Sequence, residues 1–184
     1  MKKEGKSVKK KRKPTSITQM AGEYLVASEL CKRDYVATTF TANISEFDIL
    51  VYKNGKTFPV QVKTLTNKSG WQSNIRKWMD IRFKYGKQIP GKLYNIKNPN
   101  LVFIFAVLGK GLLQDQFFFL TKKEVQNNVC KSYVKNLKKH HYRRPNKKKS
   151  LHCSLTVKEL RSISGTRDWD WIGKYMKVNK LVKG

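Results

Sequence analysis

The chain has 184 residues, and its 40 Lys and Arg residues exceed its 12 Asp and Glu residues to give a formal net charge of +28. This charge excludes an ordinary neutral metabolic enzyme as the default, while 39% hydrophobic residues and 11% aromatic residues exclude wholesale disorder. Residues 1–13 contain eight basic residues and one acid, and residues 131–149 contain nine basic residues and no acid. The length fits one domain with basic appendages.

Such a charge makes the chain repel itself unless a partner supplies anions, and phosphates are the commonest dense source of anions. We therefore expect a nucleic acid as partner, ahead of an anionic membrane surface. The longest apolar run, Leu101–Leu108, is far shorter than the roughly 18 residues of a membrane-spanning helix. The charged N-terminus lacks the apolar stretch of a secretory signal, and three cysteines cannot all pair within one chain. We expect no membrane partner and an intracellular protein, either nucleoid-associated or nuclear.

The first 14 residues show no apolar periodicity and end at Pro14, which predicts a disordered basic arm. Its central cations are candidate phosphate ligands, with a nuclear-import patch as the alternative. They are Lys9, Lys10, Lys11, Arg12 and Lys13. Residues 15–184 are predicted to form a single domain.

A helix of about 16 residues is predicted from Thr15 or Ser16 onward, because apolar residues repeat at helical spacing. The apolar arc expected to face a core consists of Ile17, Met20, Ala21, Tyr24, Ala27 and Cys31. Three strands follow, at residues 35–41, 47–52 and 57–64, where β-branched and aromatic residues are frequent. The last two are predicted to form a hairpin.

Residues 65–100 contain several breakers and predict one or two strands within a long excursion. Two tryptophans in it, Trp71 and Trp78, either stack on nucleic-acid bases or pack in the core. The run at 101–108 is apolar on both faces and predicts a central strand, with residues 116–120 as its neighbour.

A helix is expected from Thr121 to about Lys135, then a basic loop, then short helices at residues 156–163 and 168–177. The element order predicts an α/β fold around a mixed sheet. The basic loop, taken as part of residues 131–149, is either a solvated loop or a binding site for backbone phosphates, which we favour. The candidate phosphate ligands in it are Arg143, Arg144, Lys147, Lys148 and Lys149.

The hairpin collects three polar residues on one face. Asn54-Gly55 favours a two-residue turn, and in that register Asp48 lies opposite Gln61. Lys63, two residues further, emerges on the same face as Gln61. A carboxylate, an amide oxygen and an ammonium group suit a Mg²⁺ ion next to a phosphate, since Mg²⁺ prefers oxygen ligands and activates bound water. Glu23, beside the apolar arc of the first helix, is a candidate to bind a water of that metal. The alternative is that Glu23 and the three hairpin residues have ordinary structural roles, such as a salt bridge or a solvated polar position.

A family likeness rests on several motif residues. They are Gly22-Glu23, Leu30, Tyr35, Phe47-Asp48-Ile49, Gly55 and Gln61-Val62-Lys63-Thr64. In them the chain resembles the PD-(D/E)XK nuclease superfamily in its QxK variant. The likeness is to Holliday-junction-resolvase-like and intron-encoded homing endonucleases, and to Mrr-type restriction nucleases. Gln61 stands where most members have Glu or Asp, and Phe47 stands where many have proline.

This resemblance implies a restriction-endonuclease-like α-β-β-β-α-β core with a mixed sheet. It implies that Asp48, Gln61 and Glu23 hold Mg²⁺, or Mn²⁺ in its place, and that these three residues act with Lys63 in catalysis. The function implied is a metal-dependent endonuclease that hydrolyses phosphodiester bonds in branched or duplex DNA, as a homodimer or higher oligomer. The alternative is a catalytically inactive protein that binds DNA or RNA and retains the nuclease fold.

Overall fold

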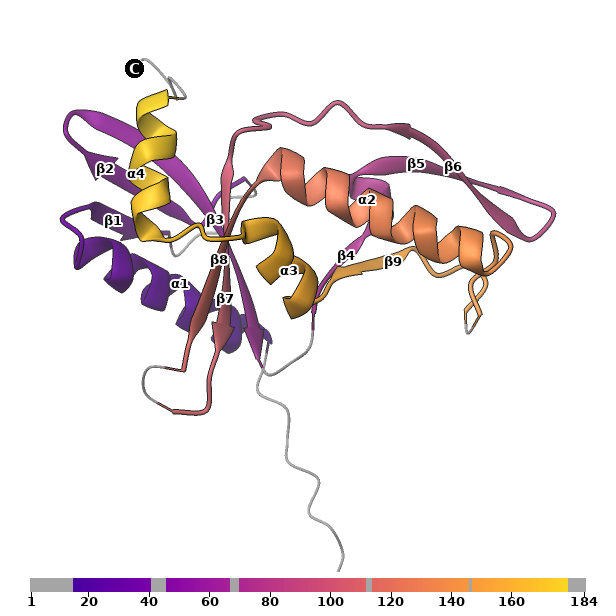
Figure 1. Ribbon diagram of the computed structural model, residues 1–184, viewed down its shortest axis with the longest axis horizontal. Helices are drawn as coiled ribbons and strands as arrows, with labels where there is room; N and C mark the ends of the chain where they lie inside the picture. Colours follow the sequence, from indigo (N-terminus) through magenta and orange to yellow (C-terminus); the bar gives the residue numbers. More distant parts are fainter. Residues whose placement is uncertain (1–14, 41–45, 67–69, 112–113, 146, 179–184) are drawn as a thin grey trace, which may run out of the picture.

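A five-stranded mixed sheet lies at the centre of the fold (Figure 1). The computed structural model describes residues 15–40, 46–66, 70–111, 114–145 and 147–178. The elements are α1 (Thr15–Cys31), β1 (Val36–Thr39), β2 (Ile49–Lys53), β3 (Lys56–Thr66), β4 (Trp71–Asn74), the 3-10 helix η1 (Ile75–Lys77), β5 (Met79–Lys84), β6 (Lys87–Leu93), β7 (Val102–Leu108), β8 (Gln116–Thr121), α2 (Lys122–Lys139), β9 (His152–Leu155), α3 (Val157–Ser164) and α4 (Trp169–Val178). The predicted α/β fold with a mixed sheet is confirmed, whereas the predicted arm at residues 1–14 lies outside the described residues.

The strands of the central sheet are ordered β1-β2-β3-β7-β8, and only the β3–β7 pair is parallel. The predicted hairpin register is confirmed, because Lys53 pairs with Lys56 and Ile49 pairs with Val60. Its turn is formed by Asn54 and Gly55, which both have positive φ angles, of 52° and 73°. Asn and Gly are the residues that this type of turn prefers.

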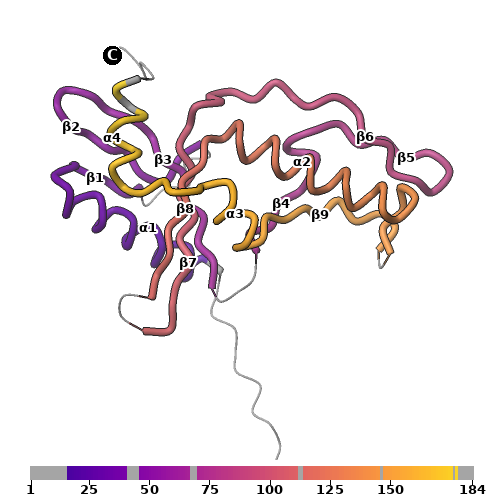
Figure 2. The backbone as a smooth tube through the Cα atoms, viewed as in Figure 1, coloured from indigo at the N-terminus to yellow at the C-terminus, as the bar shows by residue number. Residues whose placement is uncertain are grey.

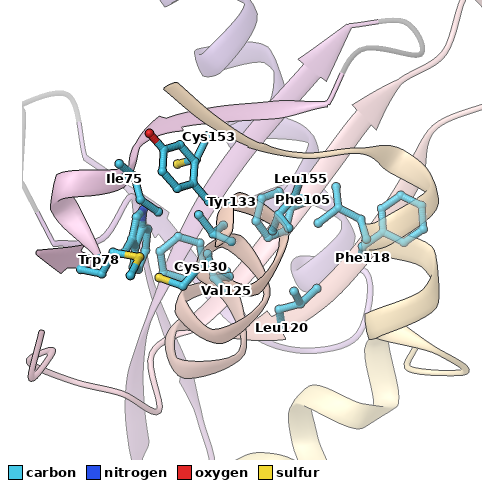
Figure 3. Close-up of a cluster of buried hydrophobic side chains, with 14 of the residues drawn as sticks. Ile75, Trp78, Phe105, Phe118, Leu120, Val125, Cys130, Tyr133, Cys153 and Leu155 are labelled. Atoms are coloured by element: carbon cyan, nitrogen blue, oxygen red, sulfur yellow. The ribbon is translucent and has the colours of Figure 1, made fainter. Parts of the chain in front are cut away.

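Each face of the sheet is covered by its own apolar core. On one face α1 and α4 pack over β-strand residues such as Val62 and Ile104. On the other face α2, α3 and the β4–β9 pair cover Phe105 and its neighbours, as Figure 3 shows. The central strand β7 is buried on both faces, as its apolar sequence predicts. Alternate residues of β3 therefore point to different layers of the protein.

The long connection from β3 to β7 forms a second lobe instead of a crossover helix. It contains β4, η1 and the β5–β6 hairpin, which runs beside α2 and extends away from the central sheet (Figure 2). Strand β4 pairs with β9, which lies about 80 residues later in the chain. We expected one or two strands here, and no prediction placed a strand at His152–Leu155.

Two sequence predictions require correction. The outward face of α1 carries Ile17, Met20 and Tyr24, which are all exposed, whereas Val26 and Leu30 are fully buried. The buried stripe is rotated from the predicted arc because α1 approaches the sheet through Gly22.

The second correction concerns the basic loop expected after about Lys135. Helix α2 continues to Lys139, because Tyr133 and Leu137 extend its buried stripe by a further turn. Part of the basic stretch at residues 131–149 is therefore helical. Within the described ranges, no helix combines the length and the apolar character needed to cross a membrane.

Candidate active site

The candidate site lies where β3 extends beyond its partner β2. Pairing between the two strands ends at Ile49 and Val60, whereas β3 continues to Thr66. Beyond this point side chains bind the open edge of β3 in place of a strand. The amide group of Gln19 donates to the Val62 carbonyl at 2.9 Å and accepts from the Thr64 N–H at 3.3 Å. This edge is therefore held by helix α1.

Asp48 binds the same edge and brings the predicted hairpin residues together. Its Oδ2 atom accepts hydrogen bonds from the Val62 N–H, at 2.7 Å, and from Gln61 Nε2. The Lys63 Nζ atom lies 3.8 Å from that oxygen. Asp48 itself donates its N–H to the Val60 carbonyl. The predicted meeting of Asp48, Gln61 and Lys63 on one face is thus observed, although the regular ladder ends one pair earlier.

Glu23 reaches the site because α1 packs very closely on β3. A Cβ atom added to Gly22 would lie 1.9 Å from Thr64 Oγ1, so only glycine permits this approach. The Thr64 hydroxyl donates to the Gln19 carbonyl, which fixes the helix at this height. Gln19 Nε2 also donates to Glu23 Oε1 at 3.0 Å. Glu23 is therefore linked to the strand edge through Gln19.

Opposite charges interact in a partly dehydrated environment at this site. Burial raises the pKa of Glu23 above its ordinary value, and the negative charge of Asp48 adds to the effect. Burial lowers the pKa of Lys63, although Asp48 and Glu23 oppose the shift. The three charged groups are therefore close enough to influence one another.

An open cleft adjoins the site on the face of the sheet opposite α1. Its volume is about 480 Å³, and both Gln61 and Lys63 line it. The walls also carry three further lysines, two tryptophans and one acid. These are Lys77, Lys97, Lys122, Trp71, Trp78 and Glu46. A groove with this charge can accept a phosphate group.

The predicted phosphate ligands outside the cleft differ in their surroundings. Arg143 and the lysines at 147–149 are exposed. Arg144 instead donates to Asn136 Oδ1 and the His152 carbonyl and lies over the Tyr133 ring, which gives it a structural role. The five predicted cations at 9–13 lie outside the described residues.

The two tryptophans of the excursion belong to the core. Trp78 is 5% exposed, donates to Ser73 Oγ and packs edge-on against Trp71. Trp71 also contacts Phe105 in the core. Both rings are therefore held by packing in the core, and both also line the cleft.

The sequence-based prediction missed Gln19, which joins three parts of the site. The available signal was its spacing of four residues from Glu23, which places both side chains on one helix face. That spacing is common on helix surfaces and predicts no contact with a strand. The contact depends on the close packing of α1 on β3 at Gly22, which only the three-dimensional structure reveals.

Comparison with known proteins gave one structural likeness. No family model matches the chain, and no curated protein matches it. The structure of a bacterial homing endonuclease, I-Ssp6803I, is similar over 91% of this chain and 99% of that one, with 10% sequence identity and a TM-score of 0.47. At this identity and score the likeness assigns neither a family nor an activity.

Proposed function

We propose that the chain is a metal-dependent nuclease that hydrolyses phosphodiester bonds in DNA. The observation that carries the proposal is the convergence of Asp48, Gln61 and Lys63 at the wall of a cation-lined cleft. The net charge of +28 adds support, because a polyanionic substrate offsets the self-repulsion of the chain. Cutting both strands of a duplex usually takes two such sites, so we propose a homodimer or a higher oligomer.

The donor set of the site fits a hard divalent cation such as Mg²⁺. In the described part of the chain, the side-chain hydrogen bonds and the ion pair of Asp48 all involve Oδ2, which leaves Oδ1 accessible. Gln61 donates its nitrogen to Asp48, so its amide oxygen is also available. Asp48 and Gln61 would hold the ion, with Glu23 reaching it through a water molecule. Oxygen ligands combined with retained waters are typical of Mg²⁺.

The bound ion would supply a water of lowered pKa and would withdraw charge from the phosphate. Lys63 is positioned to donate to a phosphate oxygen or to the attacking water, since its ammonium group faces the cleft. Gln19 and the Val62 N–H hold the carboxylates in place. In the reaction, a water gives up one proton to solvent and its oxygen bonds to phosphorus, while the P–O bond to the leaving sugar breaks and the sugar oxygen takes up a proton from solvent.

A second candidate function is DNA or RNA binding without catalysis. This candidate is favoured by Gln61, because an amide at this position gives the site one negative ligand fewer than a carboxylate would. Among the residues that the structure describes, no three His, Cys, Asp or Glu side chains lie together as a metal site. A nuclease fold with a degenerate site would bind nucleic acid through the same cations.

The experiment that separates the two candidates is a cleavage assay. Plasmid and branched DNA are incubated with the wild type and with Asp48→Asn, with Mg²⁺ or Mn²⁺ present. We expect the wild type to cut and Asp48→Asn to lose at least about 100-fold in rate while its DNA affinity changes little. Lys63→Met should behave in the same way.

Matched controls exclude a general loss of structure or charge. Asp34→Asn replaces an exposed aspartate in a turn with φ of 61°, a conformation that asparagine adopts equally well. Lys56→Met removes an exposed lysine from the hairpin turn. Both controls should cut like the wild type. Equal cutting by Asp48→Asn would refute the site, and a wild type that binds without cutting would favour the second candidate.

A further inference from the structure

The β5–β6 hairpin, called here the ribbon (residues 79–93), ends in an exposed aromatic tip. Its two turn residues are Tyr85 and Gly86, with φ angles of 49° and 70°. The Tyr85 side chain is 86% exposed, which is the largest value among the exposed apolar and aromatic residues that the structure describes. Lys84 and Lys87 pair on either side of it, and the Lys84 ammonium group lies 5.5 Å from the Tyr85 ring centre.

Turn geometry does not account for Tyr85. The β2–β3 hairpin of the same chain has the sequence Lys-Asn-Gly-Lys and turn φ angles of 52° and 73°. The ribbon has Lys-Tyr-Gly-Lys with nearly the same angles. Asparagine tolerates a positive φ, whereas a bulky residue adopts it at an energetic penalty. Tyr85 therefore stands where the backbone favours asparagine, and it packs on no core.

The two faces of the ribbon have different surroundings. Ile81 and Gln88 are buried against the rest of the lobe. The residues on the other face alternate with them and carry Arg82, Lys84 and Lys87, all exposed. Asp80 lies 3.6 Å from Arg82 near the ribbon base, and the sequence from residue 81 to residue 93 contains no acid. The solvent face is therefore cationic toward the turn.

Gln88 fastens the ribbon to the basic segment, defined as residues 138–149. The Gln88 N–H donates to the Tyr142 carbonyl at 2.8 Å, and its side-chain amide donates to the carbonyls of Lys148 and Ser150 at 2.9 and 3.0 Å. The Tyr133 hydroxyl donates to Gln88 Oε1. Gln88 is fully buried, so the network is shielded from water.

This network holds two cationic stretches side by side. In the described part of residues 138–149 no Lys or Arg forms an ion pair, and the segment contains no acid. Like charges held together without counter-ions are costly for the free protein. Phosphate groups along a nucleic-acid backbone would supply the missing counter-charge at regular spacing.

We propose that the ribbon and the basic segment form one surface that binds duplex DNA beside the cleft. In this arrangement, which rests on the proposed function, the ribbon enters the major groove. Tyr85 packs against the base edges, while Lys84 and Lys87 bind phosphates on either side. The major groove is wide enough to admit a two-stranded ribbon.

The surface lies at a defined distance from the cleft. Strand β6 leads from Lys87 toward Tyr94, which lines the cleft. At about 3.3 Å per residue this path spans roughly 20 to 25 Å, which corresponds to about seven base pairs of duplex. The ribbon therefore binds DNA away from the phosphate that is cut.

The test uses the full-length protein and a duplex of about 40 base pairs without divalent metal, so that binding is measured apart from cleavage. Tyr85→Asn should melt at the same temperature as the wild type or higher, because asparagine suits the turn. It should bind the duplex about five- to tenfold more weakly. With an unchanged or higher melting temperature, weaker binding by this variant could not be explained by a loss of folding.

The charge at the tip is tested by Lys87→Gln, with Lys56→Gln as the matched control. Both lysines follow the glycine of the same type of turn, and both are exposed. Lys87→Gln should lower the slope of log K against log salt by about 0.9, and Lys56→Gln should leave it unchanged.

Three outcomes would overturn the inference. One is wild-type binding by both Tyr85→Asn and Lys87→Gln, and another is an equal effect of Lys56→Gln. The third is that the wild type binds an RNA duplex more tightly than the DNA duplex and that the two ribbon variants lose RNA affinity by the same factors. That result would assign the surface to RNA. A wild type that cuts DNA while the ribbon variants bind normally contradicts this inference alone, whereas a wild type that binds no DNA contradicts the proposed function as well.

Discussion

At the scale of single residues, Gln61 determines how the candidate site behaves without a metal. Its side chain is 7% exposed, and its amide nitrogen donates to Asp48. This hydrogen bond gives the Asp48 carboxylate a donor, so no cation is required between the two side chains. A glutamate at the same position would place two carboxylates in contact and would need a cation between them.

We predict that Gln61→Glu makes the stability of the protein depend on divalent metal. In EDTA the variant should lose about 1 to 3 kcal/mol, because a donor is lost and two like charges meet. This corresponds to a fall in Tm of about 2 to 12 °C for a chain of this size. Added Mg²⁺ should restore most of the loss, since a ligand that binds only the folded state stabilises it. Thermal melting with and without Mg²⁺ measures the effect.

The control for this prediction is Gln116→Glu, which introduces the same charge at an exposed position. Gln116 accepts a hydrogen bond from Arg161, so a carboxylate there has a cationic partner. Its Tm should not respond to Mg²⁺. If Mg²⁺ raises the Tm of Gln61→Glu no more than that of the wild type, Gln61 does not line a metal site.

Part of the site could be predicted because a short turn fixes its register. The Asn54-Gly55 signal sets the pairing, and the period of two then places Asp48 near Gln61 and Lys63 on the same face. The contribution of Gln19 could not be predicted, because it depends on the distance between a helix and a strand. No local pattern encodes that distance.

At the scale of elements, the contact between α1 and β3 positions the acidic side of the site. Gly22 lies against Thr64, and the helix is held there by Gln19. The contact turns α1 so that Ile17, Met20 and Tyr24 face outward. The predicted arc was wrong for these three residues, because the helical spacing of apolar side chains marks their face as the buried one, whereas the close approach of the backbone occurs at a glycine.

We predict that Gly22→Ala lowers stability by about 2 kcal/mol or more, although alanine favours helices. The added methyl group would overlap Thr64 Oγ1, so α1 must move away from β3 and take Gln19 and Glu23 with it. The cleavage rate should also fall, because the movement of α1 displaces Gln19 and Glu23 from the site. Urea unfolding and the cleavage rate measure the two effects.

A second substitution tests the cause. Thr64→Ala removes the two atoms closest to the added methyl group, at 1.9 and 2.7 Å, and should restore part of the stability of Gly22→Ala. Gly111→Ala is the control, because among the residues that the structure describes its methyl group would meet no atom nearer than 3.7 Å. A Gly22→Ala protein as stable as the wild type would contradict the proposed packing.

Short-range signals predicted most elements, while the second lobe needed long-range information. The strands at 101–108 and 116–120 are apolar enough to identify alone, and the helix from Thr121 begins with a capping box to Glu124. The β4–β9 pair joins short polar strands about 80 residues apart. Such a pair has no local signature, because its backbone hydrogen bonds join segments that are distant in the sequence.

At the scale of the whole molecule, charge is distributed over several separate regions. The cleft, the ribbon, the basic segment and residues 1–13 all carry a cationic excess. Binding by many phosphate contacts is strongly salt-dependent and varies little with sequence. We therefore expect affinity to come from these regions together and specificity from a smaller set of contacts.

We predict that removing residues 1–13 weakens DNA binding by a similar factor for all sequences. For every phosphate that this segment neutralises, its removal should lower the slope of log K against log salt by about 0.9. Titrations at several salt concentrations measure the slope. A full-length chain with the eight basic residues of this segment replaced by glutamine should match the truncated protein. An unchanged slope in both would show that these cations do not contact the DNA backbone.

The open edge of β3 also affects how the protein behaves at high concentration. A strand edge with free N–H and carbonyl groups is a template on which other chains can add strands and aggregate. Here the side chains of Asp48 and Gln19 occupy the edge groups of Val62 and Thr64. The residues that build the site therefore also block intermolecular strand pairing. Solubility is for this reason a second property that substitutions at Gln19 or Asp48 will change.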